Sequence, residues 1–194
     1  MNFLAHLFLA GPTADSLIGN LGGDFVKGPL HDRFTPGIRA GIVEHRKIDS
    51  FTDAHPHVAA FRRVLIPEHG HYARVIADVF FDHFLASSFE EHAGETLEGF
   101  IERVHRALDA HIDELPGTLP YVYPLMRDQQ WLLSYREIAG IETTLARMSH
   151  RLSRRPRLEA ATHHLTDSRH ELERRFRAFF PDVVAFAQSL RIES

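Results

Sequence analysis

The sequence predicts an all-α protein that folds as a single helical domain. Apolar residues recur at the three- and four-residue spacing of helices along most of the chain, and the alternation typical of strands is nearly absent. The 194 residues are enough to bury one core, and 44% of them are hydrophobic, as in ordinary globular proteins. No internal repeat, low-complexity tract or linker divides the chain, so we expect one domain over residues 1–194.

Glycine, proline and capping residues set the expected boundaries of the first three helices. Gly11-Pro12 separates the first two, and Thr13 or Asp15 can cap the second. Pro36 suits the first turn of the third helix, after a loop rich in turn-forming residues. The expected helices span residues 2–10, 14–27 and 36–53.

Similar signals divide the rest of the chain. His55-Pro56 favours extended backbone before a short helix, and Pro67 and Gly70 interrupt the chain before a long one. Residues 115–124 are rich in proline and read as a turn-rich connector, and Pro181 should break or kink the last helix. The expected helices here span residues 57–65, 70–88, 94–114, 125–150 and 156–188.

Composition excludes several functional classes. The net charge of −4 provides no overall field for nucleic acid or an anionic membrane. The absence of cysteine excludes disulfides, thiolate metal sites and cysteine nucleophiles. No apolar stretch is long enough to span a bilayer, and the apolar start lacks the basic leader of a signal peptide. We therefore expect a cytoplasmic protein that binds neither nucleic acid nor membrane.

The third expected helix has one face that begins apolar and becomes ionisable. Ile38, Ile42, His45, Asp49 and Thr52 follow four- and three-residue steps, so they share this face. His45 and Asp49 lie on adjacent turns, where both side chains can reach one metal ion. The alternative is an ordinary surface pair, which most such spacings represent.

The helix expected at 70–88 carries two acids inside an almost unbroken hydrophobic run. Asp78 and Asp82 lie one turn apart, and His83 follows directly. A buried carboxylate needs a partner, which can be a metal ion, Arg74 or a helix N-terminus. Oxygen and imidazole ligands suit Mn, Fe, Mg or Zn, and the lack of thiolate argues against a structural zinc.

Three polar residues near the start of the chain are further candidates. Asn20 and Asp24 are one turn apart among glycines that a helix tolerates where a backbone or ligand approaches closely. They could instead mark a helix end, with the aspartate as a cap. His6 lies among apolar residues, where it is either a hydrogen-bonded core histidine or a catalytic one.

A basic segment, residues 147–157, carries five arginines and no acid. On a chain of net negative charge, such a segment is either a solvated face or a docking site for a phosphate or an acidic protein.

Short motifs are spread over nearly the whole chain: Met1-Asn-Phe-Leu-Ala-His6-Leu, Gly19-Asn20-Leu, Asp24-Phe-Val, His45-Arg-x-Ile-Asp49, Thr52-Asp53, Asp82-His83-Phe-Leu, Gln130-Trp131-Leu, Tyr135-Arg136 and Ser153-Arg-Arg-Pro-Arg-Leu158. In order and spacing, these motifs resemble the acyl carrier protein phosphodiesterases. This family is similar to a divergent branch of the HD phosphohydrolases, so the resemblance implies an HD-domain-like, all-helical, metal-dependent enzyme. The literal His31-Asp32 pair lies in a Gly-Pro loop, and we regard it as a decoy.

The resemblance implies hydrolysis of the phosphodiester between 4'-phosphopantetheine and a serine of holo acyl carrier protein. It also implies a divalent ion, Mn(II) in the first place, with Mg, Fe or Co as alternatives. Together with the residue patterns, the resemblance implies that the ion is bound by Asp24, His45, Asp49, Asp78 and Asp82. The resemblance implies catalytic roles for His6, Asn20 and His83. The residues expected to bind the acidic carrier protein are Arg46, Arg151, Arg154, Arg155 and Arg157.

Two other functions fit parts of the pattern. An HD-type phosphohydrolase acting on a nucleotide or other small phosphoester would share the metal centre but would not need the basic segment. A non-enzymatic helical module that binds an acidic protein would use its buried acids for structure alone, although a scaffold tolerates few such groups.

Overall fold

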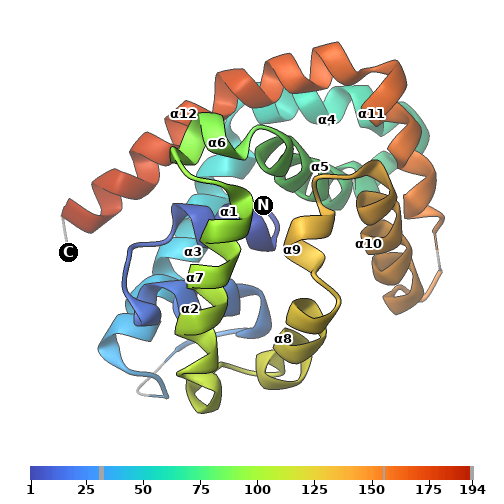
Figure 1. The fold of residues 1–194 in the computed structure, drawn as a ribbon. Helices are drawn as coiled ribbons and strands as arrows, with labels where there is room; N and C mark the ends of the chain where they lie inside the picture. The colour runs from blue at the N-terminus through green and yellow to red at the C-terminus, as the bar shows by residue number, and fades with distance from the viewer. Residues whose placement is uncertain (31–32, 155, 193–194) are drawn as a thin grey trace.

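The computed structural model describes residues 1–30, 33–154 and 156–192 of the chain. These residues form helices, short 3-10 turns and connecting loops, and none of them is in a strand (Figure 1). The prediction of an all-α fold is therefore confirmed. Within these residues, the structure contains no helix with the length and apolar character needed to cross a membrane.

The helices follow one another in chain order. They are α1 Phe3–Leu9, α2 Ala14–Gly22, α3 Pro36–Ala54, α4 Pro56–His69, α5 Ala73–Ser87, α6 Phe89–Ala93, α7 Leu97–Asp109, α8 Leu119–Asp128, α9 Trp131–Ser134, α10 Ile138–Arg151, α11 His164–Asp167 and α12 Arg169–Ile192. The 3-10 turns are η1 Gly23–Phe25, η2 Gly70–Tyr72, η3 Ile112–Glu114 and η4 Leu158–His163.

Threonine side chains cap the starts of α2 and α3. Thr13 accepts a hydrogen bond from the Ser16 amide at 3.2 Å and caps α2. Thr35 accepts one from the Ile38 amide at 3.2 Å, and Pro36 follows at the first position of α3. These caps confirm the expected starts of both helices, because each satisfies a backbone N–H that has no partner inside its helix.

Several expected boundaries in the second half are wrong. The connector expected at 115–124 contains the start of α8, whose first turn accommodates a proline. The helix expected at 125–150 is interrupted before α9 by Gln130, which adopts a left-handed φ of 50°. Gly94, with φ of 67°, ends α6, so the helix expected at 94–114 begins only at Leu97 and ends at Asp109. Helix α12 continues through Pro181 without a break.

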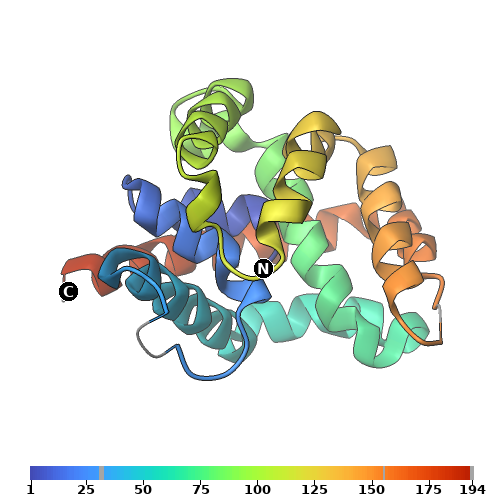
Figure 2. The ribbon, with the colours of Figure 1, turned by 90° about the horizontal axis from the view of Figure 1, so that it is seen from below.

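The helices pack around a core of buried apolar side chains that draws on most elements. Helices α4 and α12 lie alongside each other, and α5 packs against α4, α1 and α10 (Figure 1). Helix α1 also packs on α2 and α12. The start of the chain therefore lies inside the molecule, at the centre of both views (Figures 1 and 2).

Helices α2 and α3 cross at a contact that only glycine permits. A Cβ atom on Gly19 would lie 2.4 Å from the carbonyl oxygen of Ile38 and 2.7 Å from the Cα atom of Gly41. Both obstacles are backbone atoms, which cannot move aside without displacing α3. This contact brings the end of α2 against the face of α3 that carries His45, so the crossing positions the candidate site.

We expect Gly19→Ala to destabilise the protein by about 1 kcal/mol, because overpacking against backbone costs roughly 1–3 kcal/mol and the gain in helix propensity offsets only about 1 kcal/mol of it. Urea unfolding would measure the change. Gly99→Ala on α7 is the matched control, since its nearest new neighbour is the hydroxyl of Thr96 at 3.2 Å. Equal effects of the two substitutions would contradict the close crossing.

Candidate metal and active site

Side chains from α1 and α3 form a polar cluster in the interior. The Nε2 atom of His6 lies 3.1 Å from one carboxylate oxygen of Asp49, and Nε2 of His45 lies 3.3 Å from the other. The two imidazole rings stack with their centroids 3.8 Å apart. One ligand atom from each of these three residues lies within 4.8 Å of the others, close enough to share one metal ion.

The backbone of α2 sets the orientation of the His45 ring. Nδ1 of His45 lies 2.8 Å from the carbonyl oxygen of Asn20, and a carbonyl only accepts, so Nδ1 donates a proton there. Nε2 is thereby directed at Asp49 and at Asp24, 3.5 Å away. A Cβ atom on Gly23 would lie 2.3 Å from the ring, so glycine is required beside it. This arrangement is typical of a metal-binding histidine oriented by a backbone carbonyl.

The ionisable groups of the cluster shift one another's pKa values. Burial opposes the charged form of His45, but its hydrogen bonds to Asp24 and Asp49 outweigh burial and raise its pKa to about 9. Burial, together with the neighbouring His45, lowers the pKa of His6 to about 4. Burial would raise the pKa of Asp49, yet its hydrogen bonds to the two histidines hold that pKa well below the ordinary value. The carboxylate of Asp49 is therefore an anion at neutral pH.

Asp78 borders the same cluster from α5. The amino group of Met1 lies 3.1 Å from Asp49 and 3.4 Å from Asp78, and so connects the two carboxylates. A guanidinium nitrogen of Arg62 lies 3.8 Å from Asp78 and 2.8 Å from Asp53. Burial raises the pKa of Asp78 above its ordinary value despite these cations.

Asp82 faces the N-terminus of α1. Its two carboxylate oxygens accept the backbone N–H groups of Leu4 at 2.8 Å and Ala5 at 3.1 Å. This is the helix-terminus partner that the sequence left open as an alternative to a metal ion. Burial raises the pKa of Asp82 to about 7, against the opposing effect of these two hydrogen bonds. Asp82 thus fixes the helix that carries His6.

Two other predicted residues point away from the cluster. The side-chain amide of Asn20 donates to Glu44 at 3.0 Å and to the carbonyl of Ser16 at 3.1 Å. His83 donates Nδ1–H to the carbonyl of Tyr135 at 2.9 Å, on the side of α5 that faces the turn before α10. The structure therefore brings together His6, Asp24, His45, Asp49 and Asp78, and it places Asn20, Asp82 and His83 around them.

Glu44 and Arg62 also lie beside the site, although no sequence pattern above marks them as candidates. Glu44 is only 8% exposed and lies 3.2 Å from Arg191 of α12. A signal for it was present, since Glu44 lies one turn after Gly41 and therefore on the face of α3 that meets α2. Arg62 could not be found in this way, because its partners Asp53 and Asp78 come from two other helices.

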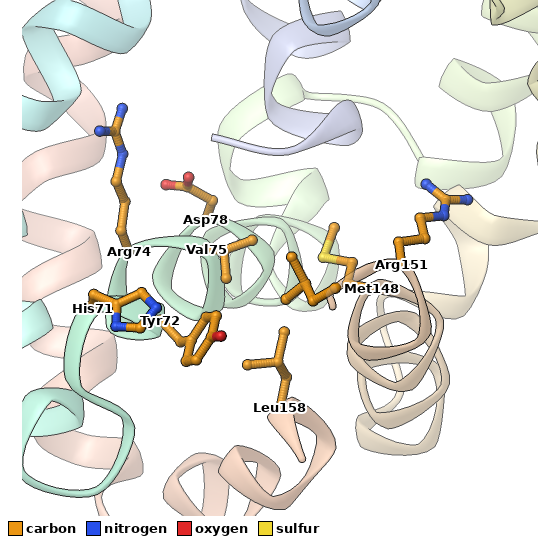
Figure 3. A pocket seen from close by; sticks show the side chains of 9 residues that line it. His71, Tyr72, Arg74, Val75, Asp78, Met148, Arg151 and Leu158 are labelled. Atoms are coloured by element: carbon orange, nitrogen blue, oxygen red, sulfur yellow. The ribbon is translucent and has the colours of Figure 1, made fainter. Parts of the chain in front are cut away.

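A pocket of about 450 Å³ opens between α5 and α10 (Figure 3). Its wall is mostly apolar and includes Val75, Met148 and Leu158. Asp78 lies on one side of it and Arg151 on the other, and both side chains extend toward the same side in Figure 3. The pocket therefore joins the polar cluster to the basic segment.

The predicted docking arginines have different surroundings. Arg151 and Arg154 are exposed, and Arg157 is 84% exposed and lies 3.5 Å from Glu159. Arg46 donates instead to the carbonyls of Val26 and Gly28, at 2.9 and 3.0 Å, and holds the loop after α2. Arg155 and the His31-Asp32 pair lie outside the described residues.

Comparisons with known proteins assign this chain to a family. A family model described as acyl carrier protein phosphodiesterase matches residues 1–183. Relatives with that name include proteins of Serratia proteamaculans, 35% identical over 99% of this chain and 100% of theirs, and Yersinia enterocolitica, 33% identical over the same shares. A third, from Shigella boydii, is 36% identical over 96% of this chain and 97% of its own. No solved structure matches, so the likeness to HD domains stays a prediction. The chain belongs to the acyl carrier protein phosphodiesterase family.

Proposed function

We propose that this protein hydrolyses the phosphodiester between 4'-phosphopantetheine and a serine of holo acyl carrier protein, with a divalent metal ion as cofactor. The products are the apo carrier protein and 4'-phosphopantetheine. The observation that carries the proposal is the pocket that joins the His6–His45–Asp49 cluster, through Asp78, to the basic segment. We place the reaction in the cytoplasm and assign all its parts to one domain.

The donor set of the cluster fits a divalent ion. His45, His6 and Asp49 would hold it, with Asp24 beside His45, and two imidazoles with carboxylates suit Mn(II) and also Fe or Co, whereas Mg prefers oxygen ligands. Such an ion would supply positive charge to the phosphodiester and make a water molecule more acidic. Asn20 and Asp82 position this set, the first through its carbonyl on His45 and the second through α1.

Asp78 lies where the pocket meets the cluster, and we assign it to the reacting group. The raised pKa of its carboxyl group suits a proton donor to the serine oxygen that leaves phosphorus. The apolar wall of the pocket suits the aliphatic parts of the pantetheine arm. Arg151, Arg154 and Arg157, at the other end, offer positive charge to an acidic carrier protein.

The first prediction concerns the reaction. The protein with Mn(II) should convert holo acyl carrier protein to the apo form, measured as loss of the prosthetic group by intact mass spectrometry. Asp49→Asn should slow conversion at least about 100-fold, because it removes an anionic ligand. Asp53→Asn, one turn further along α3 and paired with Arg62, is the matched control and should retain activity.

The other outcomes of this experiment separate the competing functions. Metal binding without conversion would favour a phosphohydrolase of small phosphoesters. If neither metal binding nor conversion occurs, the chain is a helical module that binds an acidic protein.

The second prediction concerns the metal and pH. Titration calorimetry should detect Mn(II) binding that Asp49→Asn abolishes and Asp53→Asn preserves. Because the pKa of His45 is about 9 without metal, the ion displaces a proton at any lower pH. The affinity should therefore rise with pH, by up to about tenfold per unit between pH 6 and 8 for one displaced proton. A pH-independent affinity would exclude His45 as a ligand.

The third prediction concerns docking. The double variant Arg151→Glu/Arg154→Glu should raise KM for the carrier protein about tenfold or more at low salt, since it reverses the field that steers an acidic partner. Added salt should shrink the difference from the unmodified protein. Arg106→Glu, on an exposed position of α7, should leave KM unchanged. Unaltered kinetics in the double variant would move the docking surface elsewhere.

A further inference from the structure

A second group of metal-ligating side chains lies outside the site described above. It joins the end of α4, which carries Glu68 and His69, to the junction of η4 and α11, which carries His163 and His164. One carboxylate oxygen of Glu68 lies 3.5 Å from Nε2 of His163, and the other lies 3.6 Å from Nε2 of His164. None of these residues has a role in the proposed reaction.

The separations fit a single small ion. The ligand atoms of Glu68, His163 and His164 lie within 4.8 Å of one another. A tetrahedral ion with bonds of about 2.0–2.2 Å keeps its ligands about 3.3–3.6 Å apart, which agrees with the two carboxylate–imidazole distances. Only small movements of the side chains would bring the three ligand atoms within bonding distance of one ion.

The two imidazoles present free nitrogen atoms to this space. Nδ1 of His163 lies 2.8 Å from the carbonyl oxygen of Ala160, so it carries a proton and leaves Nε2 as an acceptor in the neutral ring. The side chain of His164 is only 6% exposed, and its Nε2 atom is buried without a hydrogen-bond partner. A buried polar atom in this state is costly, and a metal bond would satisfy it.

His69 completes the surroundings of His164. Its ring lies edge-on to that of His164 with centroids 5.5 Å apart, and its buried Nε2 atom also lacks a hydrogen-bond partner. Two neighbouring imidazoles with unpartnered nitrogen atoms are unusual for a purely structural contact, because buried polar atoms are normally paired.

We propose that Glu68, His163 and His164 form a second binding site, for a borderline divalent ion such as zinc, nickel or cobalt. Two imidazoles and one carboxylate match the ligand preference of these ions and leave one position for water or His69. The ion would tie α4 to η4, and η4 begins with Leu158, a wall residue of the pocket. It would therefore hold the end of the basic segment in place, whether or not the proposed function holds.

Zinc titration of the full chain tests this site. Calorimetry on Asp49→Asn, which lacks the first site, should show one zinc equivalent, and adding either His164→Gln or Glu68→Gln to that variant should remove it. Glu68 is exposed, so its substitution keeps the protein folded even if His164→Gln does not. His170→Gln, on an exposed position of α12, is the matched control and should bind as the unmodified protein does.

Thermal unfolding provides a second readout. Saturating zinc should raise the Tm of Asp49→Asn by several degrees and should not raise that of Asp49→Asn/Glu68→Gln, because a ligand that binds only the folded state stabilises it. The proposal is overturned if Asp49→Asn/Glu68→Gln still binds one zinc equivalent, or if Asp49→Asn alone removes all zinc binding.

Discussion

The candidate site depends on the buried carboxylate of Asp82 at the N-terminus of α1. A carboxylate removed from water is stabilised only where hydrogen bonds and positive charge replace its hydration. The first amides of a helix supply both, since they have no partners within the helix and lie at the positive end of its dipole. The two hydrogen bonds to Leu4 and Ala5 thus fix the position of α1 against α5. His6 follows directly along α1, so its reach toward Asp49 is set by this contact.

The opposite wall of the cluster is set by packing between backbones. Because Gly19 lets α2 approach α3 closely, the carbonyl of Asn20 meets His45 and fixes which ring nitrogen faces the carboxylates. The wall formed by α1 is therefore positioned by hydrogen bonds to a charged group, and the wall formed by α2 and α3 by close packing at glycine. The two walls meet where the rings of His6 and His45 stack.

Sequence patterns located the parts of the site that lie within one helix. The spacing of His45 and Asp49 placed both on one face of α3, and that of Asp78 and Asp82 placed both on the inner face of α5. Spacing could not tell which neighbour each acid meets, because that depends on helices distant in sequence. Asp82 meets α1 and Asp78 borders the cluster, although the two acids occupy equivalent positions on successive turns.

Helix boundaries, too, could be predicted only where the signal lies within the helix itself. Thr13, Thr35 and Pro36 act within their own turns, so the starts of α2 and α3 could be predicted. The left-handed conformation of Gln130 has no local signal, since left-handed backbone normally selects glycine or asparagine. It divides a pattern that otherwise reads as one long helix.

Arg191 fastens the other end of α1 from the far end of the chain. Its guanidinium donates to the carbonyl of Leu9 at 2.8 Å and also lies 3.2 Å from Glu44. Arg191 and Leu9 are 182 residues apart in the sequence. Helix α1 is thus fixed at its start by α5 and at its end by α12, so the helix that carries His6 reaches its final position only through contacts between distant parts of the sequence, which form late in folding.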